Sequence, residues 1–327
     1  MSELAEAAFL CVSRDGEPVA PRGQRFQEFR RRFDERAFLA GLAARSIRWL
    51  GRSDPGFPSS LAAIFDPPAG LFVRGAARNR VLDQPAVAVV GARACSAYGA
   101  HVARMVGREL AAAGLVVVSG LARGVDGAAH RGALDANGTT IAVLGCGIDR
   151  DYPAGHRELA RQIAATGLVV SEYPPGVEPA PWRFPARNRI VAGLAAATVV
   201  VEARRRSGAL ITADLALEEG REVFAVPGEI TSALSEGTND LIRLGATPLR
   251  STGDVLEVFG LARPEAPPPP AGSTARAVLA ALRDAPASAD ELARRTELAA
   301  AELGAALVEL ELDGAIAERE GVYRTAR

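Results

Sequence analysis

The central part of the chain alternates short apolar, β-branched runs with longer stretches of helical periodicity. The apolar runs lack polar alternation, which is typical of strands buried on both faces of a parallel sheet. These runs are Val87–Val90, Leu115–Val118, Thr140–Leu144, Leu168–Val170, Thr198–Val201 and Val223–Val226. Helical spacing fills the intervals, at Ala97–Ala113, Val125–Ala136, Arg157–Ala165 and Ala209–Glu219. The alternation predicts an α/β fold with a Rossmann-like, doubly wound parallel sheet.

Most of the predicted strands end in glycine or serine. These residues are Gly91, Ser119 with Gly120, Gly145, Ser171 and Gly228. In doubly wound sheets, ligands bind at the carboxyl ends of the strands, where the strand order reverses. We therefore expect the functional site where these loops converge.

The sequence on either side divides the chain into further parts. Residues 1–80 are predicted to form a short N-terminal helical region, because helical spacing runs through Arg25–Trp49. Leu71–Gly75, near its end, is expected to be an edge strand. Residues 81–262 carry the alternating pattern and form the Rossmann-like domain. Residues 263–272 include four consecutive prolines, which is typical of a semi-rigid linker.

Residues 273–327 form a small C-terminal unit. Helical patterns run through Thr274–Arg283, Ser288–Thr296 and Ala299–Asp313, and a hairpin follows around Gly321. This order predicts a winged-helix domain. The third helix is acidic, with Glu302, Glu309 and Glu311, so a protein contact is at least as good an expectation as duplex DNA.

Composition narrows the chemistry. The 327 residues carry a formal net charge of −1, so any nucleic-acid binding must come from a local patch. All 38 basic residues are arginine, which excludes Schiff-base chemistry and a P-loop lysine. Cys11, Cys95 and Cys146 are too scattered for a disulfide framework or a zinc cluster. Together with the lack of a signal peptide or a long apolar span, they predict a reduced, cytoplasmic protein with no membrane contact.

One stretch supplies the local basic patch. Three arginines precede the strand at Thr198–Val201 and three follow it, and Glu202 is the only acid between Trp182 and Ala213. Ser207 and Gly208 then open a helix, whose free N–H groups suit a phosphate. The alternative is an ordinary strand-to-helix turn with solvated arginines. The arginines are Arg183, Arg187, Arg189, Arg204, Arg205 and Arg206.

The first strand ends where a dinucleotide fingerprint would stand, but Val87–Gly99 lacks its glycine spacing. The second strand ends in Ser119, where a nicotinamide cofactor would require an acid, so no cofactor is expected. Arg93 at the first strand end suits a phosphate, with a structural ion pair as its alternative. Asp126 and His130 lie on one helical face without a third ligand, which favours a hydrogen bond that holds the turn over a catalytic or metal pair.

Aromatic residues accompany these arginines near the strand ends. Aromatic rings beside arginines suit base stacking on single-stranded nucleic acid, although each ring alone is more often a core or rim residue. They are Tyr152, Tyr173, Trp182 and Phe184.

The motifs together resemble one known family, the DNA-processing protein A family (DprA, also called Smf). The similarity runs from about Phe57 to Phe259, and a C-terminal winged helix is similar to that of many members. Its motifs begin at Gly91, Ser119, Thr140, Ser171, Phe184, Ser207 and Gly220.

The resemblance implies an extended Rossmann domain that binds single-stranded DNA without sequence preference and forms a homodimer. It further implies a non-enzymatic protein that protects incoming single-stranded DNA and loads the RecA recombinase during natural transformation. Self-association is expected around Leu241–Val258. Two family lysines are replaced by Ala154 and Pro181, and Arg157 and Arg183 lie nearby to substitute for them. The expected DNA site comprises Gly91, Arg93, Ser119, Gly120, Arg123, Arg183, Arg187, Asn188, Arg189, Ser207 and Gly208.

Two other functions compete with this interpretation. The first is a nucleotide-processing enzyme of the phosphoribohydrolase group (often labelled lysine decarboxylase-like), whose signature fails at Ser207–Thr212. The second is an interaction scaffold built on the winged helix, in which the arginine clusters are incidental. A mobility shift that compares single-stranded with duplex DNA separates them.

Overall fold

The computed structural model describes residues 2–11, 23–261, 273–312 and 314–325. The chain divides into two compact units, Met1–Arg263 and Pro264–Arg327. The predicted proline linker at residues 263–272 lies outside the described residues.

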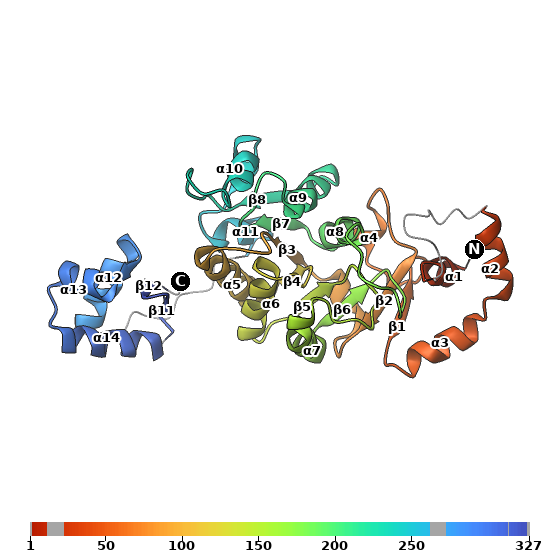
Figure 1. The fold of residues 1–327 in the computed structure, drawn as a ribbon, viewed down its shortest axis with the longest axis horizontal. Coiled ribbons are helices and arrows are strands. Elements are labelled where there is room, and N and C mark those ends of the chain that lie inside the picture. The colour runs from red at the N-terminus through yellow and green to blue at the C-terminus, as the bar shows by residue number, and fades with distance from the viewer. Residues whose placement is uncertain (1, 12–22, 262–272, 313, 326–327) are drawn as a thin grey trace. The chain divides into compact units, whose positions relative to one another are not determined.

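The described part of the first unit is built on one nine-stranded sheet with the order β1-β2-β6-β5-β4-β3-β7-β8-β9 (Figure 1). Strands β3 to β9 are parallel, whereas β1 and β2 are antiparallel to their neighbours. The order reverses at β3, which lies between β4 and β7, so the predicted doubly wound sheet is confirmed. The strands are β1 (Arg48–Gly51), β2 (Gly70–Arg74), β3 (Ala86–Val90), β4 (Val116–Ser119), β5 (Thr140–Val143), β6 (Leu168–Ser171), β7 (Ala197–Val200), β8 (Glu222–Ala225) and β9 (Thr247–Pro248).

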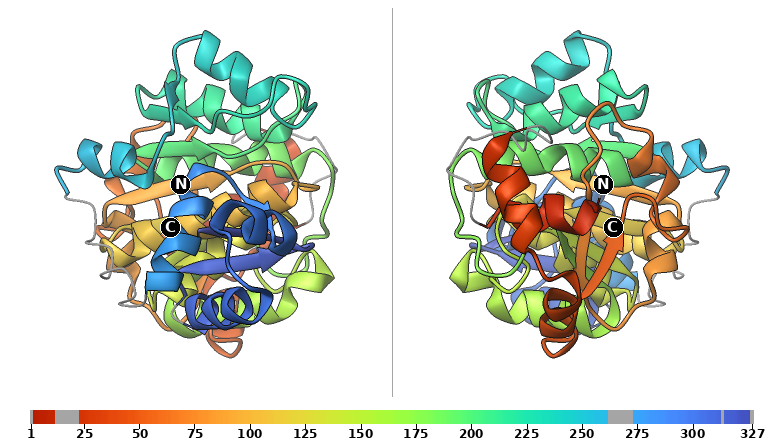
Figure 2. Two further views of the ribbon diagram at one scale, coloured as in Figure 1. Left: turned by 90° about the vertical axis from the view of Figure 1, so that its left-hand side faces the viewer. Right: turned by 90° about the vertical axis from the view of Figure 1, so that its right-hand side faces the viewer.

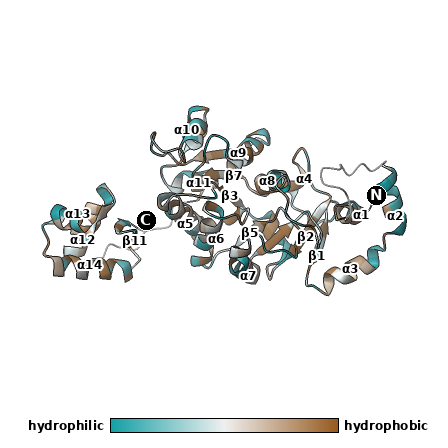
Figure 3. Ribbon diagram, viewed as in Figure 1, coloured by the Kyte–Doolittle hydropathy of each residue, from teal (hydrophilic) through white to brown (hydrophobic). Residues whose placement is uncertain are grey.

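Helices cover both faces of this sheet, as Figures 1 and 2 show. One face packs against α4, α8, α9 and α10, and the other against α5, α6, α7 and α11. Every residue of β3 to β7 is buried, which explains the unbroken apolar runs (Figure 3). The helices are α4 (Ser59–Ala62), α5 (Ala97–Ala112), α6 (Val125–Asp135), α7 (Arg157–Thr166), α8 (Arg183–Leu194), α9 (Gly208–Glu218), α10 (Glu236–Arg243) and α11 (Thr252–Val258), with short 3-10 turns at Asn79–Asp83 and Ala154–His156.

The N-terminal region contains helices α1 (Glu3–Phe9), α2 (Gln24–Arg32) and α3 (Glu35–Ala43). Ring contacts between phenylalanines of these helices lead to Phe72 of β2, which also packs against Trp49 at a centroid distance of 4.7 Å. The expectation of an edge strand at Leu71–Gly75 is wrong. β2 lies between β6 and β1, and β1 forms the edge because its Trp49 covers Phe72.

The second unit is a winged helix with a core of its own. Its helices surround the fully buried Val278, Leu292 and Leu310, and its strands form a sheet of order β10-β12-β11. Ser288 and Glu291 form a capping box at the start of α13. The elements are α12 (Ser273–Asp284), β10 (Ala287–Ser288), α13 (Ala289–Thr296), α14 (Ala300–Leu312), β11 (Ile316–Arg319) and β12 (Val322–Thr325).

Within the described ranges, none of the helices has both the length and the apolar character needed to cross a membrane. The same ranges contain no group of three or more His, Cys, Asp or Glu side chains placed to hold a metal ion.

His130 of α6 is buried against β5 and bonds to Thr140. The Thr140 hydroxyl donates to Val117 O at 2.7 Å, so His130 Nδ1–H donates to Thr140 Oγ1, also at 2.7 Å. His130 Nε2 is buried without a hydrogen-bond partner among the described residues. Burial, together with the charges of His156, Arg187 and Arg131, lowers the pKa of His130 to about 3.

This environment predicts acid sensitivity. Unfolded His130 takes up a proton near its ordinary pKa of 6.5, whereas the folded side chain stays neutral to about pH 3. Its contribution to stability is therefore complete above pH 6.5 and falls as the pH falls below it. Between pH 6.5 and 5, the wild type should lose about 2 kcal/mol more unfolding free energy than His130→Gln.

Urea denaturation near neutral pH and near pH 5 measures the difference. Equal acid sensitivity of His130→Gln and wild type would contradict the assignment.

Candidate nucleic-acid interface

Two adjoining pockets lie where the carboxyl ends of β3, β4, β5 and β7 meet. Both are lined by Arg93, Gly120, Ala122, Phe184 and Arg187. The switch-point pocket, of about 200 Å³, continues to Gly91, Asn188, Ser207 and Gly208. The Tyr152 pocket, of about 380 Å³, continues to Arg123, Gly145, Cys146, Tyr152 and Pro153. Both pockets therefore lie at the reversal of strand order, where the strand ends lead us to expect the functional site.

A cation and two aromatic rings are stacked at the boundary between the pockets. The Arg93 guanidinium lies 5.1 Å from the centre of the Phe184 ring. The Tyr152 ring stacks on Phe184 with a centroid distance of 5.4 Å and an interplanar angle of 23°. Arg93 is exposed and Tyr152 is 43% exposed, so both offer surface to a ligand. Arg93 has no ion-pair partner among the described residues, which removes support for its structural alternative.

Arg187 reaches from α8 beneath the pockets and is only 4% exposed. Its guanidinium donates to Gly120 O at 2.8 Å and to Val143 O, and so ties α8 to the ends of β4 and β5. A Cβ on Gly120 would lie 2.4 Å from that guanidinium, which explains the glycine. Burial lowers the pKa of Arg187, whereas the negative charge of Asp126 partly opposes this shift.

Asp126 holds the same loop from the other side. Its buried carboxylate accepts hydrogen bonds from Gly120 N at 3.1 Å and Ala122 N at 3.2 Å. Burial raises its pKa, while the charge of Arg187 and these N–H groups oppose the shift. Asp126 thus holds the turn as predicted, whereas His130 bonds to Thr140 instead.

The protein's own carboxylates bind backbone N–H groups at two strand-to-helix connections. At the start of α5, Glu202 accepts from Ser96 N at 2.9 Å and Ser96 Oγ at 2.5 Å, and a Cβ on Gly99 would lie 2.4 Å from it. Asp126, near the start of α6, binds N–H groups of the loop that follows β4. The Glu202 position is the one where dinucleotide-binding folds hold a pyrophosphate. The start of α9, by contrast, faces the switch-point pocket, because Ser207 and Gly208 line it.

The structure brings most of the predicted residues together. Asn188 Nδ2 donates to Gly208 O at 3.0 Å and so joins α8 to α9 beside the pocket. The predicted site residues that line one or both pockets are Gly91, Arg93, Gly120, Arg123, Arg187, Asn188, Ser207 and Gly208.

Ser119 and Arg183 lie outside both linings and turn their polar groups into the protein. Ser119 is fully buried and donates to Val89 O at 2.6 Å. Arg183 is 7% exposed, donates to Glu178 O, and lies against the rings of Tyr173 and Trp182. These two side chains hold the strand end and the start of α8.

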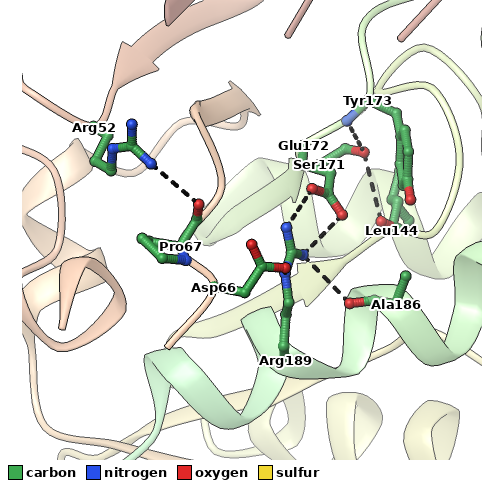
Figure 4. Close-up of polar contacts among 9 residues, drawn as sticks. All are labelled: Arg52, Asp66, Pro67, Leu144, Ser171, Glu172, Tyr173, Ala186 and Arg189. Atoms are coloured by element: carbon green, nitrogen blue, oxygen red, sulfur yellow. Dashed lines mark hydrogen bonds and ion pairs between the residues drawn. The ribbon is translucent and has the colours of Figure 1, made fainter. Parts of the chain in front are cut away.

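Arg189 also lies outside both linings. Figure 4 shows that its guanidinium lies between Glu172 and Asp66. Its guanidinium forms a bidentate pair with Glu172 at 2.9 and 2.7 Å, and its Nε donates to Asp66 Oδ2 at 2.9 Å. Burial alone would lower the pKa of Arg189, but the two carboxylates outweigh it and raise the pKa. Arg189 therefore clamps α8 to the end of β6 and to the loop before β2.

The sequence analysis did not identify the role of Glu202 as an internal anion at the start of α5. The available signal was an acid directly after a buried strand. The sequence analysis named Phe184 and Tyr152 only as candidates for base stacking. Their ring-to-ring contact depends on the fold and could not be predicted.

Comparison with known proteins places the chain in a family. Residues 48–260 match the family described as DNA recombination-mediator protein A, and residues 262–321 match the DprA winged helix domain. The chain belongs to the DprA/Smf family.

Relatives from several bacteria agree with this assignment. The DNA processing protein DprA of Streptococcus pneumoniae is 48% identical over 63% of this chain and 72% of its own length. The putative DprA of Mycobacterium tuberculosis is 46% identical over 80% of this chain and 69% of its own. Protein Smf of Escherichia coli is 40% identical over 92% of this chain and 83% of its own.

Two solved structures of the DprA/Smf family are similar to this one. The DprA structure from Streptococcus pneumoniae matches with a TM-score of 0.67 and 40% identity, over 78% of this chain and 92% of that chain. The DprA structure from Helicobacter pylori matches with a TM-score of 0.59 and 31% identity, over 65% and 95%. The latter structure is described as showing a single-stranded DNA binding mode.

The burial of Arg189 predicts a stability effect. Arg189→Ala leaves Glu172 buried without its bidentate partner, so the unfolding free energy should fall by about 3 kcal/mol. Arg93→Ala is the matched control, because it removes an exposed arginine from the same region and should cost less than about 1 kcal/mol. Chemical denaturation measures both variants, and equal losses would contradict the clamp.

Proposed function

We propose that this chain binds single-stranded DNA along the switch-point and Tyr152 pockets, without base specificity. The observation that carries the proposal is the exposed stack of Arg93, Phe184 and Tyr152 beside the open start of α9. The single-stranded DNA binding described for the Helicobacter pylori relative supports it.

The arrangement separates phosphate from base contacts. Arg93 and Arg123 are exposed without carboxylate partners among the described residues, and they neutralise phosphates together with the start of α9 at Ser207 and Gly208. Bases stack on Tyr152 and Phe184, and stacking tolerates every base because each has a π face. Gly91, Gly120 and Asn188 shape the wall, whereas Ser119, Arg183, Arg187 and Arg189 position the elements that bear it.

A non-enzymatic role fits this geometry better than nucleotide processing. A mononucleotide enzyme requires an enclosed phosphate cradle, and Glu202 already occupies the one at the start of α5. We therefore infer no cofactor and no catalytic residue.

In the cell, we infer that the chain protects incoming single-stranded DNA in the cytoplasm and loads the RecA recombinase onto it during natural transformation. Membership of the DprA/Smf family supports this inference. A homodimer is proposed through the surface around Leu241–Val258. Leu244 is 75% exposed and Val258 is 45% exposed there, whereas Val255 and Leu256 belong to the core.

Arg93 provides the test of the proposed site. Arg93→Ala should weaken binding to all sequences about equally and flatten the salt dependence by about 0.7, because one phosphate contact on a single strand is lost. Arg104→Ala is the control, because Arg104 of α5 lines neither pocket and its guanidinium is paired with Asp135 of α6. Fluorescence anisotropy with homopolymeric and mixed oligonucleotides at several salt concentrations gives the slopes. An unchanged slope in Arg93→Ala, or no binding by the wild type, would refute the proposal.

The winged helix is expected to be dispensable for this binding. Helix α14 exposes Glu302, Glu309 and Glu311 and contains no basic residue, so it cannot neutralise phosphates. A chain ending at residue 262 should keep single-strand affinity within a few fold. A loss greater than tenfold, about 1.4 kcal/mol, would place the winged helix in the DNA site.

A further inference from the structure

Three consecutive arginines lie at the carboxyl end of β7, beyond the set assigned to either pocket. Arg204, Arg205 and Arg206 are all exposed, and they connect β7 to Ser207 at the start of α9. Since Ser207 lines the switch-point pocket, these arginines lie directly next to its mouth along the chain.

The backbone of this loop is firmly held. Ser207 N donates to Arg204 O at 2.9 Å and closes a turn. Ala203 N donates to Leu234 O at 2.8 Å, and Ala203 O accepts from Gly237 N at 2.7 Å. A Cβ on Gly237 would lie 2.7 Å from Ala203 O and 2.9 Å from Arg204 O, so α10 starts in close contact with the turn. The arginines therefore extend from a fixed base.

The three side chains differ in their partners. Arg205 faces two carboxylates of α10, Glu236 at 4.0 Å and Asp240 at 3.5 Å. Arg204 and Arg206 have no ion pair or side-chain hydrogen bond among the described residues.

Two unneutralised charges two residues apart on a rigid turn repel each other, and a bound anion relieves that repulsion. A single small anion would bind at one of them only weakly in solvent. A polyanion that already enters the adjacent pocket can reach both, because it carries one phosphate for each nucleotide.

We propose that Arg204 and Arg206 form a phosphate track that carries the DNA strand out of the switch-point pocket over the start of α9. Arg205 is not part of the track, because α10 already neutralises it. The inference rests on the proposed function and extends its binding site beyond the two pockets. A strand bound along this track covers more nucleotides than one bound in the two pockets alone.

The three arginines supply a matched test. Arg204→Ala and Arg206→Ala should each flatten the salt dependence for an oligo(dT) of about 20 nucleotides by about 0.7, and the double variant by about 1.4. Arg205→Ala should change the slope much less. With an oligo(dT) of about 5 nucleotides, which the pockets accommodate, all four proteins should bind as the wild type does. Anisotropy titrations give the slopes, and thermal melting verifies that the exposed loop variants stay folded.

The outcomes separate this inference from the proposed function. Equal slope changes in all three single variants would indicate a general charge effect and overturn the track. Unchanged slopes in Arg204→Ala and Arg206→Ala, with a flattened slope in Arg93→Ala, would overturn the track and leave the pocket assignment in place. If Arg93→Ala has the wild-type slope as well, the proposed function fails together with the track.

Discussion

The buried guanidinium of Arg187 is the interaction on which the site depends. A charge at that depth is tolerated only because Gly120 O, Val143 O and the carboxylate of Asp126 compensate for the lost water. These contacts fix α8 against the ends of β4 and β5. Phe184 lies one helical turn earlier on α8, so the same contacts determine where its ring meets Arg93 and Tyr152. The stacking surface at the rim therefore takes its position from a buried guanidinium and the backbone carbonyls that it binds.

Arginine has two opposite roles in this chain, and residue type does not distinguish them. Arg187 and Arg189 are buried, and their donors are used by carbonyl and carboxylate oxygens. Arg93 and Arg206 are exposed, with no carboxylate partner among the described residues. The first kind holds elements together and the second kind is open to an anion. Burial and partners decide the role, which is why a motif of closely spaced arginines contains members of the structural kind.

The periodicity of the sequence was enough to predict the parallel sheet, the reversal of strand order and the winged helix, because each strand and helix carries its own local pattern. The motifs at Gly91, Ser119 and Ser207 also placed the pockets correctly at the strand ends. The position of β2 inside the sheet could not be predicted, since it depends on pairing with β6, far along the chain. The role of Arg189 was equally hidden, because its partner Asp66 lies 123 residues away in sequence.

The internal carboxylates fit the proposed preference of this Rossmann-like sheet for a strand over a nucleotide. Glu202 binds the N–H of Ser96 at the start of α5, where a dinucleotide phosphate would lie, and Asp126 binds N–H groups of the loop after β4. In the proposed site, anions bind further out, at exposed arginines and the start of α9, where each contact is weak and screened by salt. A lone nucleotide gains little from one such contact. A polymer gains from several at once, because the first contact raises the effective concentration of its next phosphates at the others. With a net charge of −1, the chain has no general attraction for DNA, so selectivity for a polyanion must come from this local series of contacts.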